Sequence, residues 1–451
     1  MSGPITVVGA GLAGSLAAIF LAQRGYTVTV LERRPDLRKV DISAGRSINL
    51  ALANRGIDAL RRVGLMPQIE PLLTPMRGRM LHTPAGELGF QPYGRTPTEM
   101  IYSVSRGSLN AALMDAAEAT GRVEIRFGTP CDGHDFDVDD GTPVIAADGA
   151  GSAIRAAMHA QRGITVSEEL LEHGYKELTM PAGAGGAHAM DCNALHIWPR
   201  GGYMLIALPN LDGSFTVTLF LPVDGQDSFA ALSGPAEVDA FFREHFADAH
   251  TLIPGLAEQF ATNPTGRMVT VRSEPWHIGG QALLVGDAAH AIVPFHGQGM
   301  NAAFEDCVAL DACIAEHGND WEQVFADFEA LRKPNSDAIA TMALENYVEM
   351  RDLVAQPRFQ LQKKLEFLLQ ERHPDRFIPR YAMVMFHSMP YAEAYTRGRV
   401  QKEILDALTQ RVERIEDIDL DRADQLVVSR VPAPRSSSDT HSAHRPHGTR
   451  G

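Results

Sequence analysis

The stretch GDAAHAIVPFHGQGMN (286–301) combines residue types that can bind an extended cofactor. It follows the apolar segment QALLV, which predicts a strand ending at Gly286-Asp287. An aspartate at the end of a strand can accept hydrogen bonds from a polyol chain, and a glycine-rich turn ahead of a helix can present N–H groups to a phosphate or a carbonyl. The candidate contacts are Asp287, Gly299, Met300 and Asn301. Turn residues between a strand and a helix would look the same.

The amino terminus carries a second cofactor signal. The segment ITVVGAGLAGSLAAIFLAQRGYTVTVLE (5–32) predicts a strand, a helix ending at Gly25 and a strand that closes on Glu32. In the G-x-G-x-x-G spacing, Gly9 makes the tight turn, Gly11 lets the backbone approach a pyrophosphate, and Gly14 lets helix and strand pack closely. The Glu32 carboxylate can accept hydrogen bonds from a ribose diol. Together these parts predict dinucleotide binding.

The nature of the dinucleotide depends on the later motifs. The segment AADGAGSAIR contains Asp148-Gly149, and the 286–301 stretch lies far from the first glycine motif along the chain. Three separated contact regions suit a long, extended FAD. Only one complete dinucleotide-binding unit is visible, because the glycine cluster PAGAGGAH (181–188) is expected to have no strand before it and no helix after it. We interpret that cluster as a flexible loop.

Composition excludes several classes of partner. The chain has 451 residues, 45% of them hydrophobic, and a net charge of 41 − 56 = −15, which disfavours nucleic acid and anionic lipid. The four cysteines (131, 192, 307 and 313) have no paired spacing, and His82, His196 and His290 are spaced too irregularly for a metal site. No segment has the length of a membrane span, so a soluble, cytoplasmic protein is expected, with a disordered tail over 430–451.

The three motifs and their order resemble the flavin fingerprints of the class A FAD-dependent aromatic hydroxylases. Within that family, further segments resemble the members that hydroxylate L-kynurenine: GRSINLAL (45–52), MRGRMLH (76–82), SVSRGSLN (103–110), HGYKEL (173–178), LHIWPRGGYMLIALPN (195–210) and SFTVTLF (214–220). The similarity extends from about residue 5 to 400. The resemblance implies FAD as cofactor, NADPH as a transient co-substrate and O2 as oxidant. It also implies hydroxylation of L-kynurenine to 3-hydroxykynurenine through a flavin C4a-hydroperoxide, as part of tryptophan degradation.

The resemblance also assigns site residues. Arg79 matches the family arginine that binds the substrate carboxylate, although from the sequence alone it could be a surface arginine worth about 0–1 kcal/mol. Tyr93, Asn346 and Tyr381 match other substrate contacts, and Phe295 and His296 are expected beside the ring; many relatives have phenylalanine in place of His296. The cofactor set implied by the family adds Leu12, Ala13, Arg33, Ala51, Arg106 and Cys131. No catalytic base is required, since the aniline nitrogen already donates electrons to the ring.

The predicted fold class is α/β, with a Rossmann-like FAD-binding domain of the GR2 type, an inserted mixed β-sheet substrate domain and a C-terminal helical region. The expected division is an FAD-binding domain in two parts (1–174, with substrate-domain strands near 76–104, and 276–330), a β-rich substrate domain (175–275) and helices over 331–415. Mammalian-type relatives carry a C-terminal membrane anchor where this chain has its polar tail.

Three other functions stay open from the sequence. A class A hydroxylase of another aromatic acid would share the FAD motifs, and a substrate panel would separate it. A non-catalytic flavin-binding sensor of kynurenine-like acids would not couple NADPH oxidation to product formation. An NAD-dependent dehydrogenase is disfavoured because the second and third FAD motifs would then have no purpose.

Overall fold

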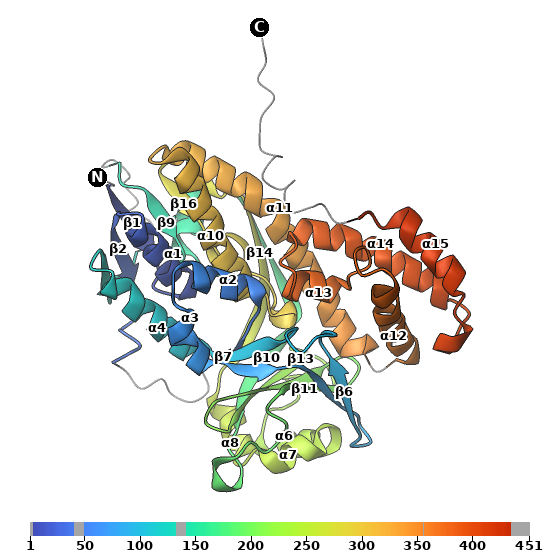
Figure 1. Ribbon diagram of the computed structural model, residues 1–451. Coiled ribbons are helices and arrows are strands. Elements are labelled where there is room, and N and C mark those ends of the chain that lie inside the picture. Colours follow the sequence, from blue (N-terminus) through green and yellow to red (C-terminus); the bar gives the residue numbers. More distant parts are fainter. Residues whose placement is uncertain (1–2, 40–48, 132–140, 355, 434–451) are drawn as a thin grey trace.

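The computed structural model describes residues 3–39, 49–131, 141–354 and 356–433. One end of the molecule is built on a sheet with strand order β15-β16-β9-β1-β2-β8 (Figure 1). All its neighbouring strands run parallel except the β15–β16 pair. Its strands are β1 Pro4–Val8, β2 Thr27–Glu32, β8 Val123–Phe127, β9 Val144–Ala146, β15 His277–Ile278 and β16 Ala282–Leu284. Because β1, β9 and β16 are neighbouring parallel strands, the first glycine motif, the Asp148 segment and Asp287 all follow the carboxyl ends of strands on the same side of the sheet.

Helices cover this sheet because its apolar, β-branched strands are buried on both faces. The predicted strand–helix–strand unit is present, with α1 (Leu12–Gln23) packed against α4 (Arg106–Ala119) and α10 (Gly299–His317). A small antiparallel sheet, β3-β7-β4, joins the six-stranded sheet and its helices to the rest of the molecule. Its strands are β3 Asn49–Leu52, β4 Thr74–Met76 and β7 Ile101–Ser105, and the other helices on this side are α2 Asn54–Arg62, α3 Met66–Ile69, α5 Ala153–Arg162 and α9 Asp287–His290.

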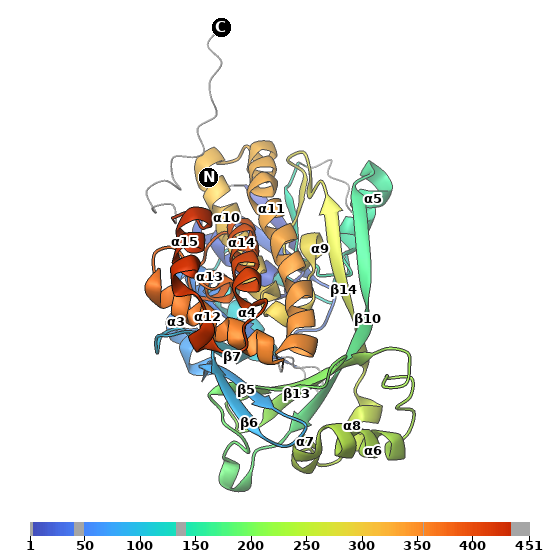
Figure 2. The ribbon, with the colours of Figure 1, turned by 90° about the vertical axis from the view of Figure 1, so that its right-hand side faces the viewer.

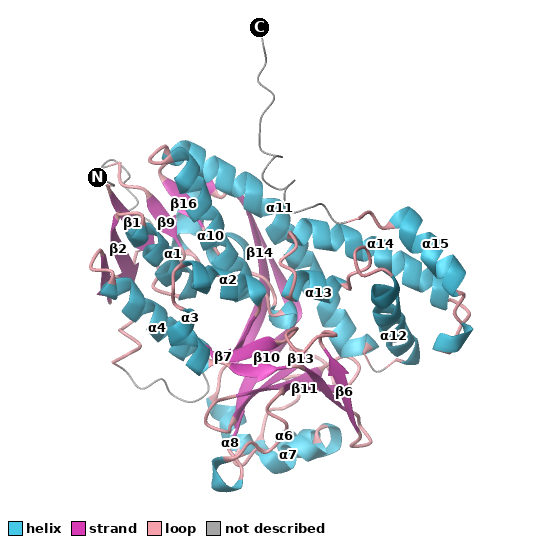
Figure 3. Ribbon diagram, in the orientation of Figure 1, coloured by secondary structure: helices cyan, strands magenta, loops and turns pink. Residues whose placement is uncertain are grey.

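The second large sheet is mixed and has the order β14-β10-β13-β12-β11-β5-β6. Its strands are β5 Gly78–His82, β6 Leu88–Pro92, β10 Thr165–Met180, β11 Ala194–Pro199, β12 Met204–Pro209, β13 Phe215–Pro222 and β14 Thr265–Glu274. The long strands β10 and β14 run from the first sheet down into the second (Figure 2). The short helices α6 Pro235–His245, α7 Ala247–Leu252 and α8 Leu256–Thr262 cover the outer face, so the inner face looks toward the rest of the molecule (Figure 3).

The C-terminal part is helical. Helix α11 (Trp321–Val348) continues into a π-helical turn, η5 (Glu349–Leu353), and α12 (Pro357–Arg372) begins at a proline as expected. The remaining helices are α13 Arg380–Met385, α14 Tyr391–Thr409 and α15 Leu420–Arg430. Helices α12, α14 and α15 form their own apolar core, while α13 packs toward Tyr93 and Met76. Among the described helices, none combines the length and the apolar character that crossing a bilayer requires.

One expectation was wrong. The glycine cluster 181–188 does follow a strand, because β10 extends to Met180 and ends directly before it. The alternation signal was hidden by the charged residues in the first half of β10. The cluster forms a turn of 3-10 helix, η3 (Ala184–Gly186), and leads into β11 without a helix of nucleotide-binding length. Residues 45–48 of the GRSINLAL segment and 434–451 of the expected tail lie outside the described residues.

Candidate active site

The glycine loop has the geometry of a phosphate-binding turn. Gly9 has φ +100°, and a Cβ on it would lie 2.6 Å from the Ala147 carbonyl oxygen. A Cβ on Gly14 would lie 1.9 Å from the Gly9 oxygen, whereas one on Gly11 would meet nothing within 4 Å. Helix α1 then begins with no side-chain cap from the described residues and no acid in its first turn. Its N–H groups and the open space at Gly11 therefore fit a pyrophosphate.

The end of β2 is tied to this loop. Glu32 accepts hydrogen bonds from the backbone N–H of Ala10 at 2.9 Å and of Arg34 at 2.8 Å. The Ala10 carbonyl in turn accepts from Asn110 Nδ2 at 3.1 Å and Ser15 Oγ at 3.2 Å. The Glu32 carboxylate keeps lone pairs beside the loop, where a ribose diol of a bound dinucleotide would lie. Asn110 was missed because a buried asparagine on a helix has no sequence pattern of its own.

The segment after β16 is held by a buried carboxylate on α10. Gly286 has φ 58° and ψ −140°, a conformation reserved for glycine, and its N–H donates to Asp306 Oδ2 at 2.9 Å. Asp306 also accepts from His290 Nε2 at 2.6 Å and Arg332 Nε at 2.7 Å. These charge-assisted bonds hold the pKa of the fully buried Asp306 at about 2, although burial alone would raise it. Asp287, the next residue, is thereby presented to the cavity.

Asn301 has a structural role in this arrangement. Its Nδ2 donates to the carbonyls of Ala51 and Gly297, both at 2.8 Å, and its Oδ1 accepts from the Ala53 N–H at 2.9 Å. The side chain is fully buried and does not line the cavity. It pins β3 to the start of α10, which places Ala51, Gly299 and Met300 along one wall.

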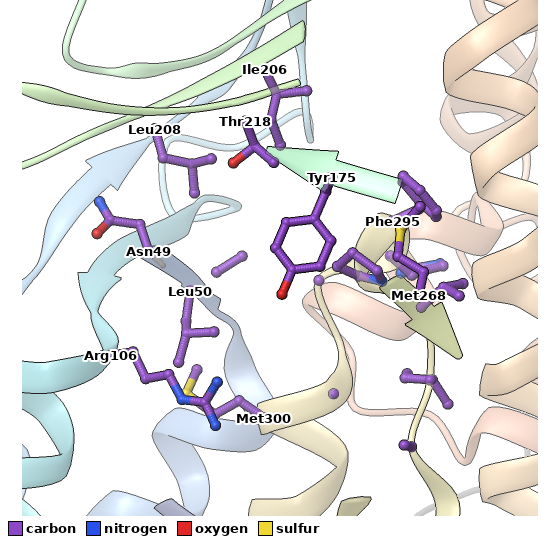
Figure 4. A pocket seen from close by; sticks show the side chains of 18 of the residues that line it. Asn49, Leu50, Arg106, Tyr175, Ile206, Leu208, Thr218, Met268, Phe295 and Met300 are labelled. Carbon is purple, nitrogen blue, oxygen red and sulfur yellow. The ribbon is translucent and has the colours of Figure 1, made fainter. Parts of the chain in front are cut away.

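A cavity of about 420 Å³ lies between the two large sheets and connects all three motif regions. In Figure 4, Arg106, Met300, Leu50 and Asn49 border one side, while Tyr175, Met268 and Phe295 border the other and Ile206, Leu208 and Thr218 form the roof. The cavity brings together most of the predicted residues: Gly11, Leu12, Ala13, Ala51, Arg79, Tyr93, Arg106, Asp287, Phe295, His296, Gly299, Met300 and Tyr381. One space thus touches both the glycine loop and the predicted substrate arginine.

Arg79 is buried at the far end of this cavity. It is 9% exposed, its Nε has no hydrogen-bond partner, and none of the described carboxylates lies within ion-pair distance of it. Its guanidinium carbon lies 5.7 Å from the ring centroid of Tyr93 and 5.2 Å from that of Tyr381. Glu349 is near enough for the Arg79 charge to help lower its carboxyl pKa, although burial opposes this. The surface-arginine interpretation is therefore wrong for Arg79.

Aromatic rings line up beside Arg79. Tyr93 and Tyr381 are stacked at 5.3 Å between centroids and 16° between planes, and His296 is stacked on Tyr381 at 5.8 Å and 17°. The Tyr93 hydroxyl and His296 Nδ1 are buried without a hydrogen-bond partner among the described residues. Burial lowers the pKa of His296 to about 4, so this imidazole is neutral near pH 7. The end of the cavity therefore holds one cation and several open polar atoms.

The remaining wall is apolar. The Phe295 ring stacks on Tyr347 at 4.0 Å and contacts Phe220 at 4.8 Å between centroids. Asn346 donates from Nδ2 to the Phe295 carbonyl at 2.6 Å and does not line the cavity. The structure thus places Asn346 behind the wall, where it fixes the Pro294–His296 turn.

Several predicted cofactor residues lie outside the cavity surface, namely Gly9, Gly14, Glu32, Arg33, Cys131 and Asn301, and so does the predicted substrate contact Asn346. Arg33 is exposed beyond β2, and Cys131 packs against the sheet core after β8. Conversely, prediction missed the lining residues of β10 and β14, namely Tyr175, Glu177, Arg267 and Met268. They lie in or beside the region predicted to be β-rich, but nothing in the sequence told which face of each strand meets the cavity.

Comparison with known proteins agrees with this architecture. Residues 3–342 match the family model described as "FAD binding domain". The fold also matches a solved structure of 2-methyl-3-hydroxypyridine-5-carboxylic acid oxygenase, with a TM-score of 0.65 at 20% identity, over 79% of this chain and 94% of that one. The fold and site define an FAD-binding flavoprotein, so the predicted fold class and the predicted cofactor, FAD, are confirmed.

The sequence relatives narrow the assignment. The chain is 53% identical over 442 residues to the kynurenine 3-monooxygenase of Myxococcus xanthus (strain DK1622), covering 95% of each chain. It is 47% identical over 443 residues to the kynurenine 3-monooxygenase of Stenotrophomonas maltophilia (strain K279a), covering 95% of this chain and 97% of the relative. The protein belongs to the kynurenine 3-monooxygenase family, and the predicted resemblance is confirmed.

Proposed function

We propose that this protein hydroxylates L-kynurenine at the ring carbon ortho to its amine, using NADPH and O2, and releases 3-hydroxykynurenine and water. The observation that carries this proposal is the buried, unpaired Arg79 in the cavity that also touches the glycine loop. A buried cation that makes no ion pair is costly in the free protein, and the charge of Glu349 offsets only part of that cost at Arg79. A ligand carboxylate would remove that cost.

Arg79 would bind the α-carboxylate of kynurenine through charge-assisted hydrogen bonds. The unpartnered Tyr93 hydroxyl can donate to the same carboxylate, and burial raises the pKa of this phenol, so it keeps its proton. The neutral His296 ring supplies a further polar atom at this end. These groups orient the amino acid so that its aromatic ring points along the cavity.

The aromatic ring of the substrate would lie against Phe295, Met350 and the roof of the second sheet. Phe295 cannot swing away easily, because Tyr347 stacks on it and Asn346 holds its backbone. Apolar walls exclude water from the reacting carbon. No acidic or basic side chain is needed to activate the ring, since its own amine donates electrons.

FAD would be held by the N–H groups at the start of α1, by Gly299 and Met300 at the start of α10, and by Asp287. Neither helix start has an acid in its first turn, so both favour an electron-rich ligand. When bound, FAD supplies the redox chemistry that accepts electrons from NADPH and activates O2. The protein's part is to place the substrate ring beside it and keep the space dry.

The test is NADPH oxidation by the purified FAD-loaded protein with and without L-kynurenine, with 3-hydroxykynurenine quantified by mass spectrometry in the same reactions. Kynurenine-stimulated oxidation with a matching amount of product supports the proposal. Stimulated oxidation that yields peroxide without product would make kynurenine an effector, and a panel of other aromatic acids would then be needed. No stimulation and no product would contradict the proposal.

A further inference from the structure

A second cavity, of about 330 Å³, adjoins the first and is not used by the function proposed above. It lies between the β3-β7-β4 sheet and the turn after β12, and it shares Asn49, Glu177 and Thr216 with the first cavity. Its rim includes the exposed Leu211 and Asp212 and the exposed Ser108 in the first turn of α4. A ligand entering there would reach the wall of the flavin cavity.

The lining of this second cavity is polar but has no basic residue among the described positions. Besides Glu177 and Asp212, it offers hydroxyl and amide side chains: Asn49, Thr74, Ser103, Ser105, Ser108, Thr179, Asn210 and Thr216. Such a lining suits an uncharged or cationic ring carrying hydroxyl and amide groups. It does not suit the interior placement of phosphates, which need N–H donors or cations.

Glu177 is the feature that points to a ligand. It stands on β10 in the partition between the cavities, is 7% exposed, and its carboxylate has no hydrogen-bond or ion-pair partner among the described residues. Burial raises its pKa to about 7, against the opposing charge of Arg106 on α4. Arg267 on β14 and Tyr175 on β10 line the first cavity, and Asp212 stands at the rim of the second. An unpartnered buried carboxylate is costly unless a cation or a hydrogen-bond donor meets it.

We propose that the second cavity binds the nicotinamide–ribose end of NADPH, with the ring beside Glu177 and the phosphates outside the rim. This inference rests on the function proposed above, which requires NADPH but leaves its docking place open. The size, the neutral polar lining and the shared wall with the flavin cavity support it. Oxidation converts the neutral dihydronicotinamide ring into a cation, so Glu177 would favour the oxidised form.

The experiment uses the protein loaded with FAD that is already reduced, under nitrogen and without kynurenine, and two probes, reduced and oxidised nicotinamide mononucleotide, whose dissociation constants are measured by calorimetry at pH 8. Ser108→Trp fills the cavity from its exposed rim and keeps the capping hydrogen bond that the Ser108 backbone N–H donates to Ser105 Oγ. Ser429→Trp is the matched control, because Ser429 is an exposed helical serine on α15. Flavin content and the kynurenine dissociation constant are measured for each variant.

Ser108→Trp is expected to raise the dissociation constants of both probes about tenfold or more, which corresponds to a loss of roughly 1.4 kcal/mol of binding free energy. Ser429→Trp should leave both dissociation constants unchanged. Glu177→Gln keeps the shape of the side chain and removes its charge, so the oxidised probe should lose several-fold more affinity than the reduced one. A role of Glu177 in folding alone would not change that ratio.

Unchanged binding in Ser108→Trp with normal flavin content would overturn the proposal. Weakened binding with an unchanged oxidised-to-reduced ratio in Glu177→Gln would overturn the placement of the ring beside this carboxylate. If the parent protein converts kynurenine while these variants bind both probes normally, only the docking site fails. If the parent protein fails to convert kynurenine, the proposed function itself is contradicted.

Discussion

Arg79 on β5 lies over the ring of Tyr381 on α13 at the far end of the cavity, with 5.2 Å between the guanidinium carbon and the ring centroid. The two residues are about 300 positions apart in the sequence. Because α13 supplies Tyr381, the C-terminal helical region completes the wall that the two sheets leave open. Substrate binding should therefore depend on all three parts of the molecule.

Replacement of Arg79 by alanine should abolish tight kynurenine binding while leaving FAD in place. Loss of a buried charge partner costs about 3–5 kcal/mol, which corresponds to a dissociation constant raised roughly 10²–10³-fold or more. Kynurenine titration followed by flavin fluorescence measures this. The kynurenine affinity of Arg79→Lys should fall between that of the parent and that of Arg79→Ala, because an ammonium cannot form the bidentate pair with a carboxylate that a guanidinium forms. An unchanged affinity in Arg79→Ala would remove Arg79 from the substrate site.

Two glycines of the first motif should respond differently to alanine. Gly14→Ala places its Cβ 1.9 Å from the Gly9 oxygen, so it should destabilise the fold itself and lower the yield of soluble protein. Gly11→Ala meets no protein atom within 4 Å, so the apoprotein should keep its thermal midpoint while its affinity for FAD falls. Thermal unfolding with and without FAD distinguishes the two. Equal FAD affinity in Gly11→Ala and the parent would argue against a pyrophosphate at this turn.

Asp287→Ala should weaken FAD retention by about 10–100-fold, the value of a hydrogen bond or two to a charged group at roughly 1.5–3 kcal/mol. Asp287 accepts no hydrogen bond that stabilises the described protein, so apoprotein stability should stay near that of the parent. Flavin content after gel filtration and urea unfolding of the apoprotein report the two effects. Full flavin retention would show that Asp287 does not contact the cofactor.

Asp306→Asn, unlike Asp287→Ala, should weaken FAD binding indirectly, by destabilising the protein that holds the cofactor. It removes the charge that pairs with Arg332 and His290 in a fully buried place, which costs about 3–5 kcal/mol. The urea midpoint of the apoprotein should fall sharply, and FAD affinity should fall with it, because asparagine keeps a single acceptor oxygen for the Gly286 N–H, His290 and Arg332. A variant as stable as the parent would show that the network is not needed to hold the turn before Asp287.

His296 should make stability depend on pH. Its folded-state pKa of about 4 lies below the ordinary 6.5, so the unfolded chain binds the extra proton and stability falls as pH drops from about 6.5 toward 4. Between pH 8 and pH 5 this group alone costs about 2 kcal/mol. His296→Phe should therefore lose that much less stability over the same range in urea unfolding. Burial also lowers the pKa of His196 to about 4. Since His196 is present in both proteins, part of the dependence of stability on pH should remain in His296→Phe.

The local parts of the cofactor site were predictable because each depends on neighbours in sequence. The strand–helix–strand unit, the three glycine roles and the Asp287 strand end follow from spacing and turn chemistry alone, and the structure places them as expected. The breaks at Pro357 and Pro379 were equally visible, since proline starts α12 and precedes α13. These features need no knowledge of the tertiary fold.

The contacts that the sequence left hidden depend on residues far apart. Asn346 matched a substrate contact by position, yet its side chain is turned to the Phe295 carbonyl, because the packing of α11 against the Pro294–His296 turn decides its direction. Arg79 could have been an ordinary surface arginine until the fold showed it buried against Tyr381 on α13. Asp306 gave no signal at all, since its three partners come together only when α9, α10 and α11 pack.

The most direct test of the central claim is to run the reaction under O2 labelled with the heavy oxygen isotope and to weigh the product by mass spectrometry. The account predicts 3-hydroxykynurenine with one labelled oxygen in its new hydroxyl group, formed only with NADPH, FAD and L-kynurenine present. Product carrying oxygen from water, or no hydroxylated kynurenine while NADPH is consumed, would contradict it.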